Sequence, residues 1–231
     1  MPTVASYNIR KSVGLDRKRR PDRILDVLAE LDADIVALQE ADRRFGARHT
    51  TIPFHMLAEQ GRFRPVPFNV RHGSLGWHGN AILVGEGVDI LRCQPLTLPA
   101  LEPRGAVMAD LSVRGAKVRV IGMHLDLSGL WRRKQARAIL HHIEQQAEAL
   151  PVVMMGDMNE WSAARGCLHD FGHHHACAVT GPSFHARRPI ARLDRIFAGP
   201  GVTIEAAGVH GSAAARIASD HLPVWARIAI G

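Results

Sequence analysis

The sequence contains little cysteine, few aromatic residues and no long apolar run. Its three cysteines, Cys93, Cys167 and Cys177, include no close pair, so it predicts neither a disulfide framework nor a zinc cluster and favours a reducing compartment. Aromatic residues make up 5% of the chain, so platforms for stacking single-stranded nucleic acid are scarce. Because no segment reaches membrane-spanning length and no basic start precedes an apolar stretch, we expect a cytoplasmic protein.

The 231 residues are enough for a sizeable core, since 46% of them are apolar and they are spread along the whole chain. We expect one domain over residues 1–231, folded throughout, and a monomer. The formal net charge is +7, with an excess of arginine, whose planar guanidinium suits bidentate contact with phosphate oxygens. The charge favours an anionic substrate or surface, although solubility alone would also explain it.

Four short apolar runs, rich in β-branched residues, each stop at an acid, an amide or a histidine. The runs are 4–7, 35–39, 118–123 and 152–156, and the residues that follow them are Asn8, Glu40, His124 and Asp157. Runs of this length predict strands with at least one buried face.

Two segments have helical periodicity, one from Pro21 to Leu31 and one over about 131–150. Each precedes a run that ends in a carboxylate, so the order predicts crossover units and an α/β fold. The middle of the chain instead predicts antiparallel meander strands over 81–84, 88–98, 106–113 and 117–124. The sheets should therefore be mixed, with a last strand over 222–230.

Glu40, Asp157, Asn159 and Asp220 are hard oxygen donors beside apolar runs, where a charge is costly without a partner. This pattern predicts a divalent cation. Mg²⁺ fits best because it prefers oxygen ligands and needs few from the protein, and Mn²⁺ is the alternative. Zinc is disfavoured, since the candidate histidines lack the i, i+4 helical spacing.

Asp157 and Asn159 are two residues apart, so on an extended segment both side chains would point the same way. The carboxylate could orient or deprotonate a water molecule, and the amide could hold that water or a phosphate oxygen. The alternative is an ordinary turn at the end of a strand.

Asp220 and His221 enter the last predicted strand, where both could reach one cleft. His221 could bond to phosphate or donate a proton, provided that another carboxylate fixes its tautomer, and Asp194 is the candidate. His124 is a second candidate for stabilising the transition state or protonating the leaving oxygen. Asp126 could orient His124 or belong to a loop.

Two residues are candidates for substrate binding. Arg104 could clamp an anionic oxygen or be an ordinary surface arginine. Asn80, at the start of a strand, could hold the site together or shape a turn. The triplet His173-His174-His175 could bind a metal, but a solvated loop is the favoured interpretation.

Taken together and in this order, seven segments resemble the endonuclease/exonuclease/phosphatase superfamily, which includes deoxyribonucleases, abasic-site endonucleases, neutral sphingomyelinases and inositol polyphosphate 5-phosphatases. The segments are Tyr7-Asn8-Ile9, Leu38-Gln39-Glu40, Gly79-Asn80-Ala81-Ile82, His124-Leu125, Gly156-Asp157-Met158-Asn159, Leu193-Asp194-Arg195-Ile196-Phe197 and Ser219-Asp220-His221. The resemblance implies a four-layer αββα sandwich of two mixed, largely antiparallel sheets, with a metal site at one edge.

The resemblance also implies roles for individual residues. Glu40 would be the main Mg²⁺ ligand, with Asn8 and Asp220 nearby. Asp157 and Asn159 would position the attacking water. Asp194 would orient His221 against the scissile phosphate, and His124 would assist at the phosphate or leaving group.

The substrate remains open between three hypotheses. The first is a nuclease or phosphodiesterase that uses the basic clusters 17–20 and 132–134 to follow the phosphate backbone of DNA or RNA. The second is the same chemistry on an anionic phospholipid or inositol phosphate. The third is a catalytically silent nucleic-acid-binding module. Abasic-site repair is disfavoured, because this chain has His124 at the position where abasic-site endonucleases look to carry a Tyr and an Asn in a proline-containing loop.

Overall fold

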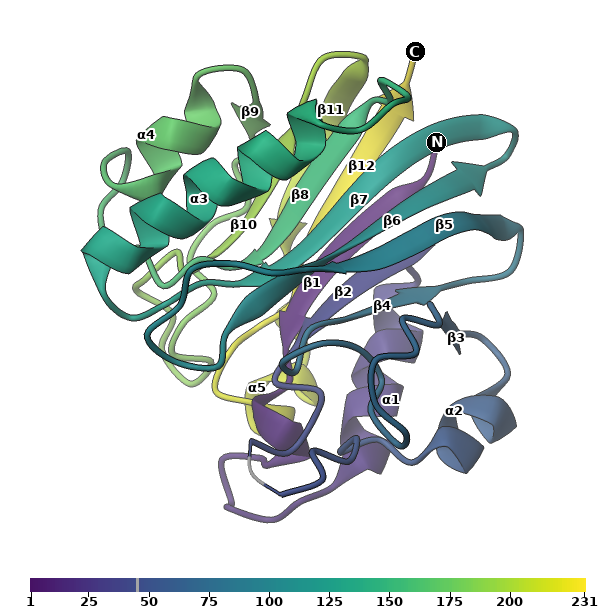
Figure 1. Cartoon of the computed structure of the whole chain (residues 1–231). Helices are drawn as coiled ribbons and strands as arrows, with labels where there is room; N and C mark the ends of the chain where they lie inside the picture. Colours follow the sequence, from purple (N-terminus) through teal and green to yellow (C-terminus); the bar gives the residue numbers. More distant parts are fainter. Residues whose placement is uncertain (45) are drawn as a thin grey trace.

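The computed structural model describes residues 1–44 and 46–231, and in that part of the chain two six-stranded sheets pack face to face between layers of helices (Figure 1). This arrangement confirms the predicted four-layer αββα sandwich.

The first sheet combines the N-terminal strands with the C-terminal ones. Its order is β11 (Val202–Val209), β12 (Val224–Ile230), β1 (Thr3–Asn8), β2 (Ile35–Gln39), β4 (Ala81–Val84) and β3 (Arg64–Pro65). β1 and β2 are parallel, because helix α1 (Pro21–Leu31) connects them, and the other pairs are antiparallel.

The second sheet is formed mainly by the middle of the chain. Its order is β5 (Val88–Leu96), β6 (Gly105–Val113), β7 (Ala116–His124), β8 (Val152–Asp157), β10 (Asp194–Ala198) and β9 (Ala176–Cys177). The parallel pair here is β7 and β8. The predicted four-strand meander is wrong at its first member, because Ala81–Val84 pairs with β2 in the first sheet, and only β5, β6 and β7 form the meander.

Helices cover the outer face of each sheet. The first sheet is covered by α1, α2 (Phe54–Gln60) and α5 (Ala215–Ala218), and the second by α3 (Gly129–Glu144) and α4 (Cys167–Gly172) (Figure 1). A short 3-10 turn, η1 (Arg10–Ser12), follows β1.

The helix predicted over 131–150 is correct in position but wrong at its end. α3 stops at Glu144, and the following segment turns back to enter β8, which must run parallel to β7. Arg119 in β7 holds this returning segment, since its backbone N–H donates to Pro151 O at 2.8 Å and its Nη1 donates to Glu148 O at 3.1 Å.

Three apolar clusters correspond to the three contacts between the four layers. Val4, Val107 and Val153 belong to the cluster between the sheets. Each outer cluster packs one sheet against its helices. Leu28 of α1 belongs to the cluster outside the first sheet, and Ile139 of α3 belongs to the cluster outside the second. The two sheets are therefore fixed to each other by close-packed side chains, so the strand ends at one edge are held in place.

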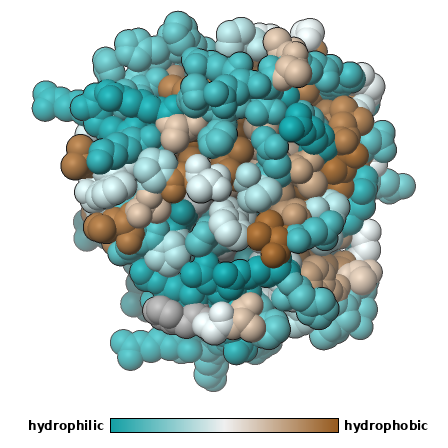
Figure 2. Space-filling model, in the orientation of Figure 1, coloured by the Kyte–Doolittle hydropathy of each residue, from teal (hydrophilic) through white to brown (hydrophobic). Residues whose placement is uncertain are grey.

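The chain termini lie near each other at one end of the sandwich, and β1 runs away from that end (Figure 1). The face of the molecule in Figure 2 is largely hydrophilic, with apolar residues in separate patches. Within residues 1–44 and 46–231, no helix combines the length and the apolar character needed to cross a membrane.

Candidate active site

The predicted site residues meet at one edge of the sandwich, where strands of both sheets begin or end. Asn8 ends β1 and Glu40 follows β2 in the first sheet, and His221 precedes β12 there. His124 ends β7, Asp157 ends β8 and Asp194 begins β10 in the second sheet. Parallel strands end together and antiparallel neighbours start where they end, so strand pairing brings the residues of each sheet to one edge. Packing of the two sheets then brings the two sets together.

Asp157 lies at the centre of this edge. It is paired in register with His124 on one side and with Asp194 on the other. His124 Nε2 is 3.3 Å from Asp157 Oδ2, and Asn8 Nδ2 donates to the same oxygen at 2.9 Å. The carboxylate of Asp157 therefore joins the two sheets and has a fixed orientation.

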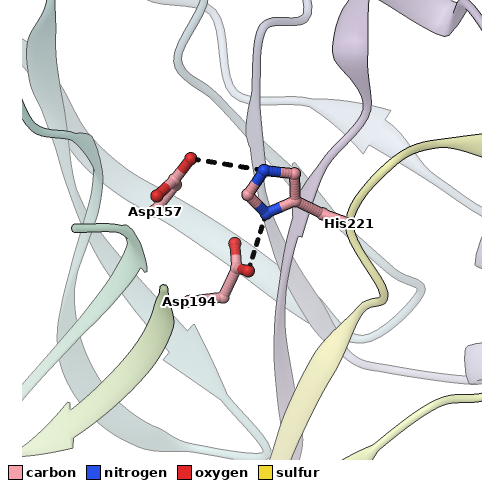
Figure 3. Close-up of side chains that lie close together, drawn as sticks. All are labelled: Asp157, Asp194 and His221. Atoms are coloured by element: carbon pink, nitrogen blue, oxygen red, sulfur yellow. Dashed lines mark hydrogen bonds and ion pairs between the residues drawn. The ribbon is translucent and has the colours of Figure 1, made fainter. Parts of the chain in front are cut away.

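His221 lies between two buried carboxylates (Figure 3). Its Nδ1 is 2.8 Å from Asp194 Oδ2, and its Nε2 is 3.8 Å from Asp157 Oδ2. The first distance is a hydrogen bond, in which Nδ1–H donates, and the second is too long for one. Nε2 is thus held close to Asp157 without being bonded to it.

The charges in this group stabilise one another. Burial alone would lower the pKa of His221, but the Asp194 and Asp157 carboxylates raise it to about 10. Burial would raise the pKa of Asp157, but the facing His221 and the bonds from His124 and Asn8 lower it below its ordinary value. For Asp194, burial outweighs His221 and raises the pKa. His221 is therefore an imidazolium at neutral pH, and Asp157 is ionised.

Two residues that support His221 carry no signal in the sequence. Ser183 Oγ donates to Asp194 Oδ2, and the Phe184 ring lies 4.9 Å from the His221 ring between centroids. Both belong to an irregular segment without periodicity. They reach the site because Leu222 N–H donates to Ser183 O at 2.9 Å.

Asn159 reaches the edge by a turn, which is the alternative that the sequence left open, and not on an extended segment. Its φ is +50°, in the left-handed region, and its backbone N–H donates to Asp157 Oδ1 at 3.0 Å. Its side-chain Nδ2 donates to Leu125 O at 3.0 Å. One amide N–H is therefore committed to the protein, and the amide oxygen and the second N–H can address water or substrate.

Glu40 and Asp220 lie on either side of η1 and are more accessible than the His221 group. Their side chains are 24% and 22% exposed, and they form ion pairs with Lys11 and Arg10 respectively. Burial would raise the pKa of Glu40, but the His124 and Lys11 charges lower it. Sequence reasoning missed both cations, although they come two and three residues after Asn8.

These residues fit a hydrated divalent cation. Glu40 and Asp220 offer partly exposed carboxylates, and Asn8 offers an amide oxygen between them in the sheet. Asp157, Asp194 and His221 also have ligand atoms within 4.8 Å of one another. We favour the first set, because Mg²⁺ keeps several waters, whereas the second set is buried and His221 is already bonded to Asp194.

The other candidates have defined contacts. Arg104 is largely buried and contacts His124 and Glu102. Asn80 is fully buried, and its Nδ2 donates to Gly105 O at 3.0 Å, which ties the start of β4 to β6. Asp126 accepts from the backbone N–H of Ser128 at 2.9 Å and so shapes a loop.

One of the proposed phosphate-tracking arginines is not available for that role. Arg132 is 8% exposed, and its Nη2 lies 3.1 Å from Glu160 Oε2 while its Nη1 donates to Leu127 O at 2.6 Å. It fixes two loops beside the site to each other. The proposed contact with a phosphate backbone is therefore wrong for Arg132, and it stays a prediction for the exposed Arg133 and Lys134.

Comparison with known protein families gives a match over most of the chain. The model of the endonuclease/exonuclease/phosphatase family matches residues 5–221. The chain belongs to this family. Its members hydrolyse phosphate esters and depend on divalent metal ions, and the acids and histidines at the strand edge suit that chemistry.

Solved structures share the fold. A family protein from Bacteroides vulgatus is 19% identical, with a TM-score of 0.79 and coverage of 100% of this chain and 99% of its own. D. rerio TDP2 with a single-stranded DNA product is 19% identical, with a TM-score of 0.76 and coverage of 99% and 98%. A Bacteroides thetaiotaomicron mannosyl-6-phosphatase is 20% identical, with a TM-score of 0.74 and complete coverage of both chains. Among curated proteins, no sequence matches this chain.

Proposed function

We propose that this protein is a Mg²⁺-dependent phosphodiesterase that hydrolyses P–O bonds of nucleic acid. The observation that carries the proposal is the position of His221, which Asp194 holds at 2.8 Å beside Asp157 while Glu40, Asn8 and Asp220 lie at the same edge. We further propose that it acts as a monomeric single domain in the cytoplasm, where its free thiols Cys93, Cys167 and Cys177 would stay reduced.

The metal-binding residues in this proposal are Glu40, Asp220 and Asn8. A bound Mg²⁺ ion supplies Lewis-acid polarisation of the phosphate oxygens. Lys11 and Arg10, which pair with the two carboxylates, lie where they can also contact an anionic substrate. Mn²⁺ suits the same oxygen ligands.

Asp157 orients the attacking water in this mechanism. Its lowered pKa makes it a weak base, so orientation contributes more than removal of the proton. Asn159 can contact the same water through its amide oxygen. Asn8 and the Asn159 backbone N–H hold the carboxylate in position.

His221 donates a hydrogen bond from Nε2–H to a phosphate oxygen and stabilises the charge that develops there. Asp194 keeps Nδ1 protonated and the ring oriented. His124 and Arg104 approach the site from the side of the second sheet, where both can neutralise phosphate charge and His124 can protonate the leaving oxygen. Together these residues surround the position that a phosphate would occupy.

An exposed aromatic side chain beside the site favours nucleic acid over a lipid head group. Trp161 is 66% exposed, and its ring lies 6.1 Å from that of Phe184, which in turn packs against His221. Glu160 fixes the segment, because its Oε1 accepts from Ser162 N–H at 3.0 Å. Although aromatic residues are few, one is positioned where a base could stack.

The test is hydrolysis of supercoiled plasmid, single-stranded DNA and bis(4-nitrophenyl) phosphate with Mg²⁺. We expect Glu40→Ala and His221→Ala each to lower the rate by about 10²-fold or more, and the exposed Glu59→Ala to match the unchanged protein. Equal rates in all proteins would remove the proposal. Faster hydrolysis of phospholipid vesicles or inositol phosphates than of nucleic acid would reassign the substrate.

A further inference from the structure

A pocket rich in arginine opens beside the proposed metal site, and three of its arginines, Arg43, Arg44 and Arg48, have no role in the mechanism above. We call it the arginine pocket, and its distinctive lining residues are Arg43, Arg44, Arg48, His78, Glu102 and Arg104. Its empty space, including the open mouth, is about 480 Å³. Glu40 and His124 form its boundary with the catalytic edge, so a ligand in the pocket would be directly next to a phosphate bound there.

The lining of the arginine pocket carries an excess of positive charge. Five cations, the four arginines and Lys11, face three carboxylates, those of Glu40, Asp42 and Glu102. Glu40 belongs to the proposed metal site. Asp42 is bonded away from the pocket, because Ser74 Oγ donates to it at 2.6 Å and Leu75 N–H at 3.0 Å. The surplus of two positive charges, five less three, favours an anionic ligand.

Arg48 is held in this pocket by a neutral group instead of a carboxylate. Its Nη1 donates to His78 Nδ1 at 2.7 Å, which requires that Nδ1 carries no proton. Burial, Arg48 and Arg71 lower the pKa of His78 and keep the ring neutral. The guanidinium is therefore oriented while its charge stays available to a ligand.

His78 is rigidly connected to the catalytic edge. It lies in a tight turn closed by two hydrogen bonds of 2.9 Å between Trp77 and Asn80, and its φ is +50°. In the same turn, Gly79 O accepts from Ala41 N–H at 2.9 Å, directly after Glu40. Gly79 has a φ of +80°, and an added Cβ would lie 3.4 Å from the Glu40 Cα. The pocket and the metal ligand thus have a fixed separation.

We propose that the arginine pocket binds a second phosphate group of the substrate, adjacent to the scissile phosphate. This rests on the proposed function, because the first phosphate is assigned to the catalytic edge. Guanidinium groups bind phosphate through charge-assisted, bidentate hydrogen bonds, and Arg48 and Arg104 line the pocket from two different loops. The preferred substrate is therefore a phosphodiester with a neighbouring phosphate, either a terminal monoester or the next backbone phosphate.

The experiment compares three substrates with Mg²⁺, namely thymidylyl-thymidine, the same dinucleotide with a 5′-terminal phosphate, and a thymidine trinucleotide. In the unchanged protein we expect the second phosphate to raise kcat/KM by about tenfold or more, as for a charged hydrogen bond. Preference for the phosphorylated dinucleotide identifies a terminal monoester as the ligand, and preference for the trinucleotide identifies the backbone.

Arg48→Asn and His78→Asn are the variants of choice, because asparagine tolerates the left-handed backbone at both positions. In each we expect the advantage of the second phosphate to shrink to about twofold. Arg92→Ala is the matched control, since Arg92 lies on β5 and bonds to Gln94 and Gln146 at the surface. It should keep the full advantage.

Calorimetric measurement of inorganic pyrophosphate binding in the presence of EDTA gives a readout that does not depend on turnover. We expect its Kd to rise about tenfold in Arg48→Asn and to stay unchanged in Arg92→Ala. Unchanged pyrophosphate binding in Arg48→Asn, or hydrolysis of all three substrates at equal efficiency, overturns the pocket proposal alone. No Mg²⁺-dependent hydrolysis of any of the three overturns the proposed function itself.

Discussion

Asp194 of the second sheet and His221, which precedes a strand of the first, form a hydrogen bond, with 2.8 Å between Asp194 Oδ2 and His221 Nδ1. Asp194 is fully buried, so the bond is shielded from water and fixes the ring firmly. Asp194→Asn keeps the shape but removes the negative charge and allows the ring to adopt the other tautomer. We expect kcat to fall by about 10²–10⁴-fold with little change in KM.

Steady-state kinetics on a nuclease substrate checks this expectation, with circular dichroism to show that the variant is folded. Asp170→Asn is the control, because Asp170 pairs with surface arginines on α3 and lies outside the site. A kcat within threefold of the unchanged protein, which is about 0.7 kcal/mol, would show that Asp194 has only a structural role.

Glu40→Gln tests the metal site. The substitution removes one of two carboxylates proposed to hold the cation, so the Mg²⁺ concentration for half-maximal activity should rise about tenfold or more. Activity at saturating Mg²⁺ should recover in part. The measurement is a Mg²⁺ titration after EDTA treatment, with Glu59→Gln on the exposed face of α2 as the control. Identical titration curves for the two variants would contradict the assignment.

Local patterns in the sequence predict the strands that carry the site, because each ends where an apolar run meets a polar residue. The run before Asp157 is fully buried in β8, and the run before Glu40 is fully buried in β2. Periodicity also finds α1, whose residues Ile24 and Leu28 are buried on one face. What these patterns cannot supply is pairing, since β4 joins β2 across a long separation in sequence.

The contacts that complete the site depend on tertiary packing and not on local pattern. Ser183 and Phe184 come from an irregular loop, and only their pairing with residues near His221 brings them to the edge. The sequence left open whether Asn159 lies on an extended segment or in a turn, because its positive φ goes with bonds to Asp157 and Leu125. The arginine pocket combines loops around residues 48, 78 and 104, which no spacing rule connects.

A buried ion pair under α3 allows a test of stability. Arg119 is 2% exposed, and its Nε and Nη2 bond to Asp110 at 2.7 and 3.0 Å across β6 and β7. Arg119→Met leaves the Asp110 carboxylate buried without a partner, so we expect a loss of about 3–5 kcal/mol in the free energy of unfolding. The double variant Asp110→Leu with Arg119→Met should recover most of that loss. Urea unfolding measures both, and a cost below about 1 kcal/mol for the single variant would contradict this account.

The neutral His78 predicts a specific dependence of stability on pH. Its pKa in the folded protein lies below the ordinary value of 6.5, because burial and Arg48 disfavour the charged ring. As the pH falls below 6.5, the unfolded chain takes up a proton that the folded chain does not, so the unfolded state is favoured. The unchanged protein should therefore lose more stability between pH 7.5 and 5.5 than His78→Asn does. Thermal unfolding at both pH values checks this, and NMR titration of the His78 ring measures the pKa directly.

Trp161 and Trp131 form a matched pair for testing base stacking. Trp161 lies beside Phe184 and the catalytic edge, whereas Trp131 lies on α3 and contacts Lys134 at 4.4 Å from the ring centroid. Stacking of one base on an aromatic ring contributes about 1–3 kcal/mol. Trp161→Ala should therefore raise the KM for single-stranded DNA about tenfold or more while kcat changes less, and Trp131→Ala should leave KM within about twofold. If both substitutions have the same effect on KM, Trp161 has no special contact with the substrate, and the preference for nucleic acid loses its structural support.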